Sequence, residues 1–400
     1  RPIESRLALA VAATYVAFLL CAQFGFLAQV ERLWSADPRA LHAILTAMGL
    51  GGLGGGVAAA LLVPSRPLPS CTRGALLSVA LACWLSQTVE GLIGALVAAA
   101  ALGSSLGFVT VLLAGTLDRW VSRRRVPWVA GWGTGAAYLF SNLPWFFSGT
   151  PSIRALAPAA LCGVAALLVP SRCPEATDGA HETSGQGGRP VRFAGWVIAF
   201  AALVAVDSAA FAHVQKVPRL LAVSWGEPLL ALRQGALHLL GALLASRFFD
   251  RRRGLGVLSA TAGAFALGLP LLAAAPGMRS TVGAMLYALG IGAYSAALVA
   301  APTAAGGAGG LRRAAWLYSI AGWLASGVGV AIAESAGART LAWAGAAGFA
   351  IYLASEIRLD RMASGRLVLL GAVAVAAWGV LAFGRSGPPA AGTIASDPAA

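Results

Sequence analysis

Thirteen long apolar runs, separated by short polar segments, dominate the chain. Most approach the roughly 20 residues that an α-helix needs to cross the hydrocarbon core of a membrane, where a helix satisfies its own backbone hydrogen bonds. The pattern therefore predicts an all-α integral membrane protein. We expect spanning helices near residues 7–30, 43–63, 75–89, 91–117, 128–148, 155–170, 193–216, 229–249, 255–275, 281–304, 314–334, 340–357 and 367–383.

A polar stretch at 171–192, rich in Gly and charged residues, divides the first twelve runs into two sets of six. This composition is typical of a linker between two compact units. The sequence thus predicts an N-terminal six-helix half at 1–170 and a C-terminal six-helix half at 193–357. An extra transmembrane helix at 358–383 and a Gly/Pro/Ala-rich tail at 384–400 follow.

Composition agrees with the pattern. The chain is 58% hydrophobic and 11% charged, with a mean hydropathy of +0.77, which excludes an ordinary soluble domain. The net charge of +14 would suit a nucleic-acid binder, but 20 of the 29 Lys and Arg residues lie in segments on the side of the N-terminus. This bias follows the positive-inside rule. It predicts a bacterial inner membrane protein with a cytoplasmic N-terminus and a periplasmic C-terminus, and no nucleic-acid partner.

The usual signatures of catalysis and metal binding do not occur in the sequence. It has no Walker loop, no H-E-x-x-H, no G-x-S-x-G and no haem-attachment motif, so neither an enzyme nor a nucleotide-driven pump is expected. The five cysteines show no C-x-x-C spacing. The seventh and eighth predicted helices hold His213 and His238 but no Met, which disfavours copper. We expect no cofactor and no metal within this chain.

Two local sequences repeat between the predicted halves. The loop after the second helix of the C-terminal half is FFDRRRG, with Asp250, Arg251 and Gly254. The equivalent loop of the N-terminal half, VPSRPLPSCTRG, lacks the acidic residue. The loops before the fifth and eleventh helices end in RRVPW and RRAAW.

With its two six-helix halves, polar central loop and acidic-basic-glycine sequence, the chain resembles the major facilitator superfamily of secondary transporters. The resemblance implies that two halves rock around a central cavity and that a small solute binds near the middle of the bilayer. It also implies a gating role for the loop that contains Asp250, Arg251 and Gly254. Because no nucleotide site is present, an ion gradient is the expected energy source. The expected partners are the lipid bilayer and the solute.

Ionisable residues inside a membrane are costly, so each needs a partner, a water-filled cavity or a function. Asp207 is the most deeply placed acid, and Arg233 enters the next helix at similar depth. Gln234 and His238 share one face of that helix, at spacing i, i+4. We predict that Asp207 pairs with Arg233 and that, with His213 and His238, they form a cavity-facing cluster on a substrate or proton pathway. A purely structural ion pair, and unrelated orientations of the two side chains, are the alternatives.

In the N-terminal half the candidate cavity residues are uncharged. Tyr138 and Asn142 lie in YLFSNLPWFF, where Pro144 is expected to kink the helix. Tyr15, Gln23 and Gln87 are further candidates. The scarcity of charge favours a neutral or apolar solute, while the Arg in the eighth helix leaves a carboxylate open.

Glycines cluster in three predicted helices, at Gly52 to Gly56, Gly131 to Gly135 and Gly322 to Gly327. Small residues let helix backbones approach closely in a membrane. We therefore expect close helix crossings at these three places.

A second hypothesis comes from DSAAF at 207–211 and from the tail that ends in SDPAA at 396–400. Together they resemble facilitator-type chains fused to an exported c-type cytochrome domain. That resemblance implies a membrane anchor or assembly component of a respiratory electron-transfer module, with a C-terminal cytochrome domain or a respiratory oxidase as partner. Such a component need not transport a solute.

Overall fold

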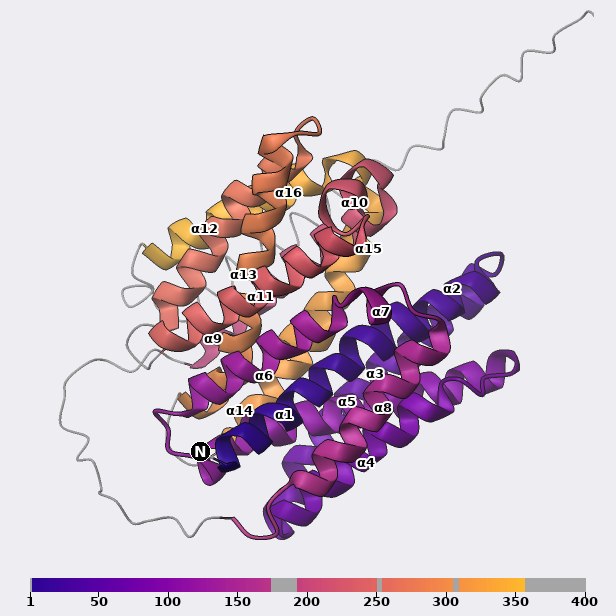
Figure 1. The fold of residues 1–400 in the computed structure, drawn as a ribbon, viewed down its shortest axis with the longest axis vertical. Coiled ribbons are helices and arrows are strands. Elements are labelled where there is room, and N and C mark those ends of the chain that lie inside the picture. The colour runs from indigo at the N-terminus through magenta and orange to yellow at the C-terminus, as the bar shows by residue number, and fades with distance from the viewer. Residues whose placement is uncertain (1, 174–192, 250–253, 305–308, 357–400) are drawn as a thin grey trace, which may run out of the picture.

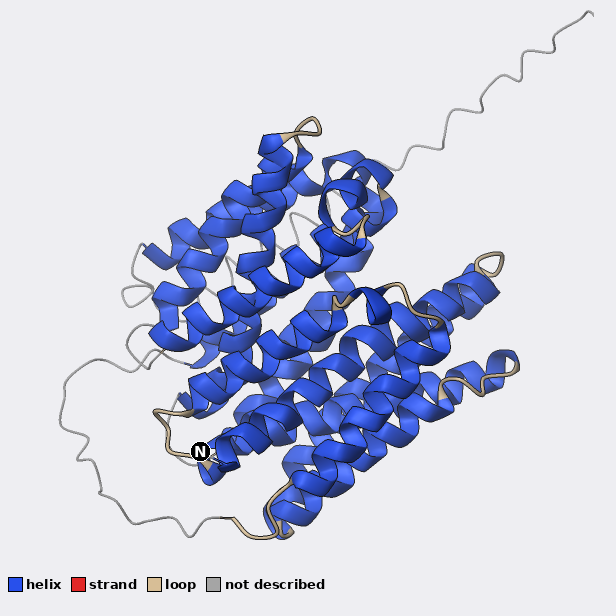
Figure 2. Ribbon diagram, in the orientation of Figure 1, coloured by secondary structure: helices blue, strands red, loops and turns tan. Residues whose placement is uncertain are grey.

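The computed structural model describes residues 2–173, 193–249, 254–304 and 309–356. These residues form helices joined by short connections (Figure 2). The predicted extra helix at 358–383, the tail at 384–400, and the gating residues Asp250 and Arg251 lie outside the described residues. The same holds for most of the predicted linker.

The helices up to residue 168 form what we call the N-terminal group. They are α1 Pro2–Val16, η1 Ala17–Leu27, α2 Ala28–Trp34, α3 Pro38–Leu62, η2 Val63–Ser65, α4 Leu68–Leu85, α5 Gly91–Trp120, α6 Val126–Ser141, α7 Pro144–Phe147 and α8 Pro151–Leu168. α1, η1 and α2 form one continuous rod of 33 residues whose middle part, η1, is π-helical. Local chemistry sets several starts: the Asp37 side chain accepts hydrogen bonds from the first turn of α3, and Pro38 occupies its first position.

The remaining helices form the C-terminal group. They are α9 Phe193–Lys216, α10 Pro218–Ser224, α11 Pro228–Phe248, α12 Gly254–Ala273, α13 Met278–Ala304, α14 Gly310–Leu317, η3 Tyr318–Ala325, α15 Ser326–Ala336, η4 Gly337–Arg339 and α16 Thr340–Glu356. Here too a π-helical segment, η3, interrupts a long rod, between α14 and α15. Figure 1 shows the two groups side by side, with α6 and α11 adjacent where they meet.

Ten helical rods are long and apolar enough to cross a membrane, by length and composition and among the described residues. The sequence predicted twelve spans over this stretch. The fifth is shorter than expected because α6 ends at Ser141 and α7 begins at Pro144. The twelfth corresponds to α16, which among the described residues counts as a shorter apolar helix over Thr340–Ile351. The predicted total of thirteen stays a prediction.

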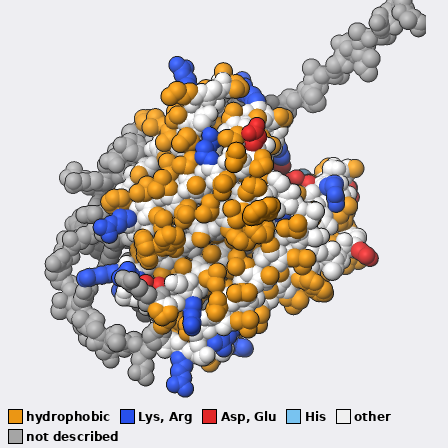
Figure 3. Space-filling model, in the orientation of Figure 1, with side chains coloured by type: hydrophobic (Ala, Val, Ile, Leu, Met, Phe, Trp, Pro, Cys, Tyr) orange, Lys and Arg blue, Asp and Glu red, His pale blue; other side chains and the backbone are white. Residues whose placement is uncertain are grey.

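The outer surface suits a membrane. Large apolar side chains are exposed around the bundle, among them Leu61, Ile93 and Leu167, which are 72%, 78% and 82% exposed. In Figure 3 hydrophobic side chains cover the middle of the visible face, and the charged ones lie nearer its margins. An exposed apolar belt of this kind is expected where lipid replaces water.

Small residues let several helices touch backbone to backbone. A Cβ atom at Gly55 of α3 would run into the backbone of Ser104 in α5, and one at Gly131 of α6 would lie 2.8 Å from the carbonyl oxygen of Ala242 in α11. The close crossings predicted at 52–56 and 131–135 are therefore confirmed. The third prediction is wrong at Gly327, where a Cβ would meet no atom within 4 Å.

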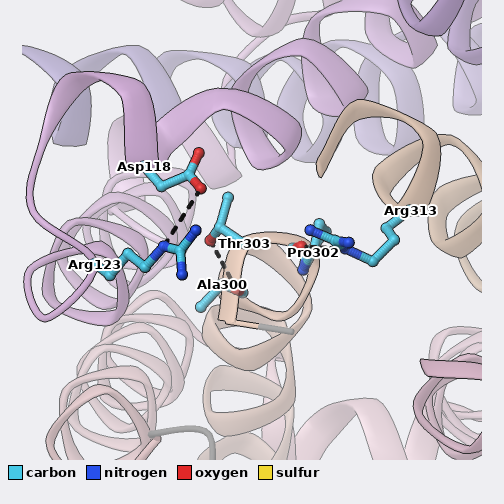
Figure 4. A network of polar contacts seen from close by, with 6 residues as sticks. All are labelled: Asp118, Arg123, Ala300, Pro302, Thr303 and Arg313. Carbon is cyan, nitrogen blue, oxygen red and sulfur yellow. Dashed lines mark hydrogen bonds and ion pairs between the residues drawn. The ribbon is translucent and has the colours of Figure 1, made fainter. Parts of the chain in front are cut away.

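The bundle is closed between the two groups at the end that carries the N-terminus. A Cβ at Gly115 of α5 would lie 2.7 Å from the Cα atom of Leu311 in α14. Figure 4 shows the polar contacts there: Arg123 lies 3.9 Å from Asp118. The Arg313 side chain donates a 2.7 Å hydrogen bond to the carbonyl oxygen of Pro302. The contact of Gly115 joins α5 to α14, and the Arg313 hydrogen bond joins α14 to the end of α13. The Asp118–Arg123 pair lies within the end of α5 and the loop after it.

Candidate functional site: a cavity between the two helix groups

A cavity of about 140 Å³ lies between the two groups. One water molecule needs roughly 10–15 Å³ by the same kind of measure, so the space exceeds that of a single water several times. Both groups contribute to its wall, from α1, η1, α5 and α6 on one side and from α9, α11, α13, η3 and α15 on the other. The polar lining residues are Thr14, Tyr15, Gln23, Thr110, Tyr138, Ser141, Asn142, Asp207, Ser208, His238, Tyr294, Ser295, Tyr318 and Ser326.

Asp207 is the acidic group in the described lining of this cavity. The hydroxyl of Tyr287 donates a 2.6 Å hydrogen bond to Oδ1 of Asp207, and the hydroxyl of Tyr294 donates to Oδ2. The two tyrosines are seven residues apart on α13, which places them on one face two turns apart. One helix thus supplies a donor to each carboxylate oxygen.

Tyr138 and His238 form a second polar pair, contributed by α6 and α11. Their rings stack with centroids 4.5 Å apart and planes 5° from parallel. The Tyr138 hydroxyl lies 3.1 Å from Oγ of Ser295. Nδ1 of His238 lies 2.6 Å from the carbonyl oxygen of Gln234, so this nitrogen carries a proton and donates; in the neutral form of the ring, Nε2 is an acceptor.

Trp225 bridges the two groups at the end of the cavity away from the N-terminus. It follows α10, is 4% exposed, and donates a 3.0 Å hydrogen bond from Nε1 to Oδ1 of Asn142. Asn142 in turn donates to the carbonyl oxygen of Tyr138 at 2.8 Å. Nearer the N-terminal end, the hydroxyls of Tyr15 and Tyr318 lie 3.4 Å apart across the cavity. Polar contacts between the groups therefore exist on both sides of the carboxylate.

The predicted ion pair between Asp207 and Arg233 is wrong, because each has another partner. Arg233 donates a 3.1 Å hydrogen bond to the carbonyl oxygen of Val223 and does not line the cavity. Similar depth in adjacent helices is not sufficient for pairing, since a side chain near a helix end can turn toward the connecting segment. The charge of Asp207 is consequently faced by neutral phenols.

Four of the seven residues predicted for the substrate or proton pathway line the cavity: Tyr138, Asn142, Asp207 and His238. Three do not. His213 is buried at the end of α9, and Gln234 is fully buried, with no hydrogen-bond partner for its amide nitrogen or oxygen. Of the predicted gating residues, Gly254 begins α12, where a Cβ would lie 2.7 Å from the Trp196 ring. The predicted functional roles stay predictions.

The sequence did not single out the tyrosines of α13 or the serines that line the cavity. The signal was present, because Tyr287 and Tyr294 recur at spacing i, i+7 in an otherwise small and apolar helix. Ser208 and Ser326 donate and accept one hydrogen bond at 3.0 Å between α9 and α15. In the described part of the chain no group of three His, Cys, Asp or Glu side chains could hold a metal ion.

Comparison with known proteins relates the fold to solved structures only. No family model matches the sequence, and no curated protein sequence matches it. The human organic anion transporter MFSD10 (TETRAN) is 11% identical, with a TM-score of 0.65 over 89% of this chain and 99% of that one. The nucleoside transporter NupG is 12% identical, with a TM-score of 0.59 over 89% of this chain and 100% of that one.

A third structure is that of FucP, described as a major facilitator superfamily transporter in the outward conformation. It is 15% identical, with a TM-score of 0.61 over 90% of this chain and 99% of that chain. Identities this low show the fold and no more. The chain therefore has the fold of the major facilitator superfamily transporters.

Proposed function

We propose that this protein is a secondary transporter that moves a small solute across a bacterial inner membrane by alternating access. The observation that carries the proposal is the cavity: both helix groups build it, it lies midway along the rods, and a carboxylate lines it. Transporters with this kind of fold place the binding site between two units that rock against each other. A purely structural membrane anchor would not need a carboxylate beside an internal cavity.

The proposal includes coupling to an ion gradient and a cytoplasmic N-terminus. The sequence has no nucleotide-binding motif, and its basic residues concentrate on the side of the N-terminus. The neighbours in fold include an organic anion transporter and a nucleoside transporter. These solutes differ widely in charge, so the residues of this cavity, and not the fold, must define the solute here.

Accessibility labelling tests alternating access without knowledge of the solute. In a variant without the five native cysteines, Ser326→Cys places a thiol in the cavity lining. We expect a membrane-impermeant thiol reagent to modify it from either side, in right-side-out and in inside-out vesicles. Ser224→Cys is the matched control, because Ser224 is fully buried and lies outside the lining. Modification of Ser326→Cys from one side alone would contradict the proposal.

A further inference from the structure

The described lining of the cavity holds one acidic side chain, while Arg154 lies outside that lining and donates a 2.7 Å hydrogen bond to the carbonyl oxygen of Phe24. The acidic side chain is Asp207, and none of the described lining residues is Arg or Lys. Arg233, which could have neutralised the carboxylate, donates to the carbonyl oxygen of Val223 instead. An anionic solute would therefore meet a like charge and no compensating cation, which disfavours its binding.

Asp207 has hydrogen-bond capacity left for a ligand. A carboxylate has about four acceptor sites on its two oxygens, and the hydroxyls of Tyr287 and Tyr294 each occupy one. Both partners are neutral, so they satisfy lone pairs without cancelling the charge. An ionised carboxylate that is buried without a counter-charge is costly, and a cationic solute would supply the counter-charge that stabilises the ionised form of Asp207.

Three aromatic rings line the same cavity as the carboxylate. Phe211 lies one turn beyond Asp207 on α9 and so on the same face. Its ring makes edge contacts with Phe24 of η1 and Trp225, at centroid distances of 5.8 and 5.7 Å. All three rings line the cavity. Aromatic faces attract organic cations and bind the apolar body of a ligand as well.

We infer that the cavity binds a monovalent organic cation, with its ammonium group beside Asp207 and its apolar part among Phe24, Phe211 and Trp225. The inference rests on the proposed function, because it names the solute class of the same cavity. It differs from the sequence-based expectation of a neutral or apolar solute, which came from the scarcity of charge, and from the carboxylate that Arg233 left open.

Direct binding of three probes with the same ring tests the inference. The full chain in lipid nanodiscs is dialysed against benzyltrimethylammonium, benzyl alcohol or phenylacetate, which carry a fixed positive charge, no charge and a negative charge. We expect benzyltrimethylammonium to bind in a saturable way, and the other two to bind at least roughly tenfold more weakly. No saturable binding of the cation up to millimolar concentration, or equal binding of benzyl alcohol, would overturn the inference.

Variants assign the binding to this cavity. Asp207→Asn keeps the shape, can accept from one tyrosine hydroxyl at Oδ1 and donate to the other from Nδ2, and we expect it to weaken cation binding roughly 30-fold. Phe211→Leu should weaken it roughly threefold. The matched control is Glu227→Gln, an exposed acid before α11, which should leave affinity unchanged. Thermal unfolding of each variant in nanodiscs verifies folding. Cation binding that survives Asp207→Asn in a folded protein would contradict the assignment.

The same probe separates this inference from the proposed function. Proteoliposomes loaded with unlabelled benzyltrimethylammonium should take up the labelled cation by exchange, and Asp207→Asn should abolish the exchange. Binding that depends on Asp207 without exchange would support the cation site and contradict transport. Exchange of benzyl alcohol or phenylacetate, but not of the cation, would support transport and overturn the cation site.

Discussion

Asp207 differs from most buried carboxylates in having phenols, and no basic side chain, as its partners. Tyr287 and Tyr294 satisfy both of its oxygens from a single helix. This arrangement fixes the orientation of the carboxylate while leaving its charge uncompensated. At the scale of the residue, the site is preorganised for a ligand that brings the missing charge.

Trp225 offers a test of the bridge between the helix groups. Replacing it by Phe keeps an aromatic ring but leaves Oδ1 of Asn142 buried without its donor. We expect the free energy of unfolding to fall by roughly 1–3 kcal/mol, measured by thermal and denaturant unfolding in detergent. Trp145→Phe is the control, because that side chain is 80% exposed. Equal stability of the two variants would show that the bridge contributes nothing.

Single polar residues in apolar runs were visible from the sequence, and this is why Asp207, His238, Asn142 and Tyr138 could be placed in the cavity. Their partners were not predictable in the same way. The direction of a long side chain near a helix end depends on the connecting segment. Here that segment places the carbonyl oxygen of Val223 within hydrogen-bond distance of Arg233. Tyr and Ser are also common in membrane helices, so their presence alone did not distinguish cavity residues from ordinary packing residues.

The contact between α3 and α5 depends on glycine at one helix face. Gly55 lies against the backbone of Ser104, whereas its neighbour Gly54 faces open space. Adjacent residues on a helix point about 100° apart, since each turn has 3.6 residues. The two glycines therefore make a matched pair with the same chemistry and different surroundings.

Alanine at Gly55 should force α3 and α5 apart. We expect Gly55→Ala to reduce the free energy of unfolding by roughly 1–3 kcal/mol, because a methyl group there has no room. Gly54→Ala should be neutral or slightly stabilising, since alanine restricts the unfolded chain. Thermal unfolding of both variants in the same detergent decides the matter. A similar loss for both would mean that the close approach is not what glycine provides here.

At the scale of elements, apolar length predicted where most of the rods lie, because a spanning helix needs a continuous apolar run. The predicted boundary at Glu90 also divides α4 from α5. The next residue, Gly91, has a φ of +68°, which favours glycine. The early end of α6 was less visible. Leu143 is extended before Pro144, as residues before proline usually are, so the chain makes a break where a kink was expected.

For the whole molecule, the closure between α5 and α14 requires glycine at position 115. Alanine there would place its Cβ 2.7 Å from the Cα atom of Leu311, so we expect Gly115→Ala to force the two helices apart and to open the cavity at the N-terminal end. The labelling rate of Ser326→Cys by a membrane-impermeant thiol reagent from the side of the N-terminus measures the opening and should rise. Gly74→Ala is the control, because a Cβ at Gly74 would meet no atom within 4 Å. An unchanged labelling rate in Gly115→Ala would contradict closure at the N-terminal end.

Orientation in the membrane gives the fourth prediction. The bias of basic residues places the N-terminus and residue 173 in the cytoplasm, and residue 149 on the opposite side. In a bacterial host, a fluorescent protein fused after Cys173 should fluoresce, and alkaline phosphatase fused after Gly149 should be active. With the two reporters exchanged, neither fluorescence nor phosphatase activity should be detected. Activity of phosphatase after Cys173 would reverse the proposed topology.

A facilitator-type helix bundle could be predicted for the whole molecule, because the division of the apolar runs into two sets of six is visible in the sequence alone. How the groups meet was not. The contacts of Gly115 with Leu311 and of Asn142 with Trp225 join residues far apart in the chain. Such pairs depend on three-dimensional packing, which no local pattern in the sequence encodes.

The π-helical segments η1 and η3 change the register of the two rods that contain them. A π-helical turn closes with one residue more than an α-helical turn. Residues beyond each segment are therefore rotated, on the order of 100°, from the face that an uninterrupted α-helix would give them. If the helical repeat of α1 is extrapolated into α2, or that of α14 into α15, the wrong residues are therefore assigned to the lipid-facing and interior faces. Facing patterns in these rods must be counted separately on each side of residues 17–27 and 318–325.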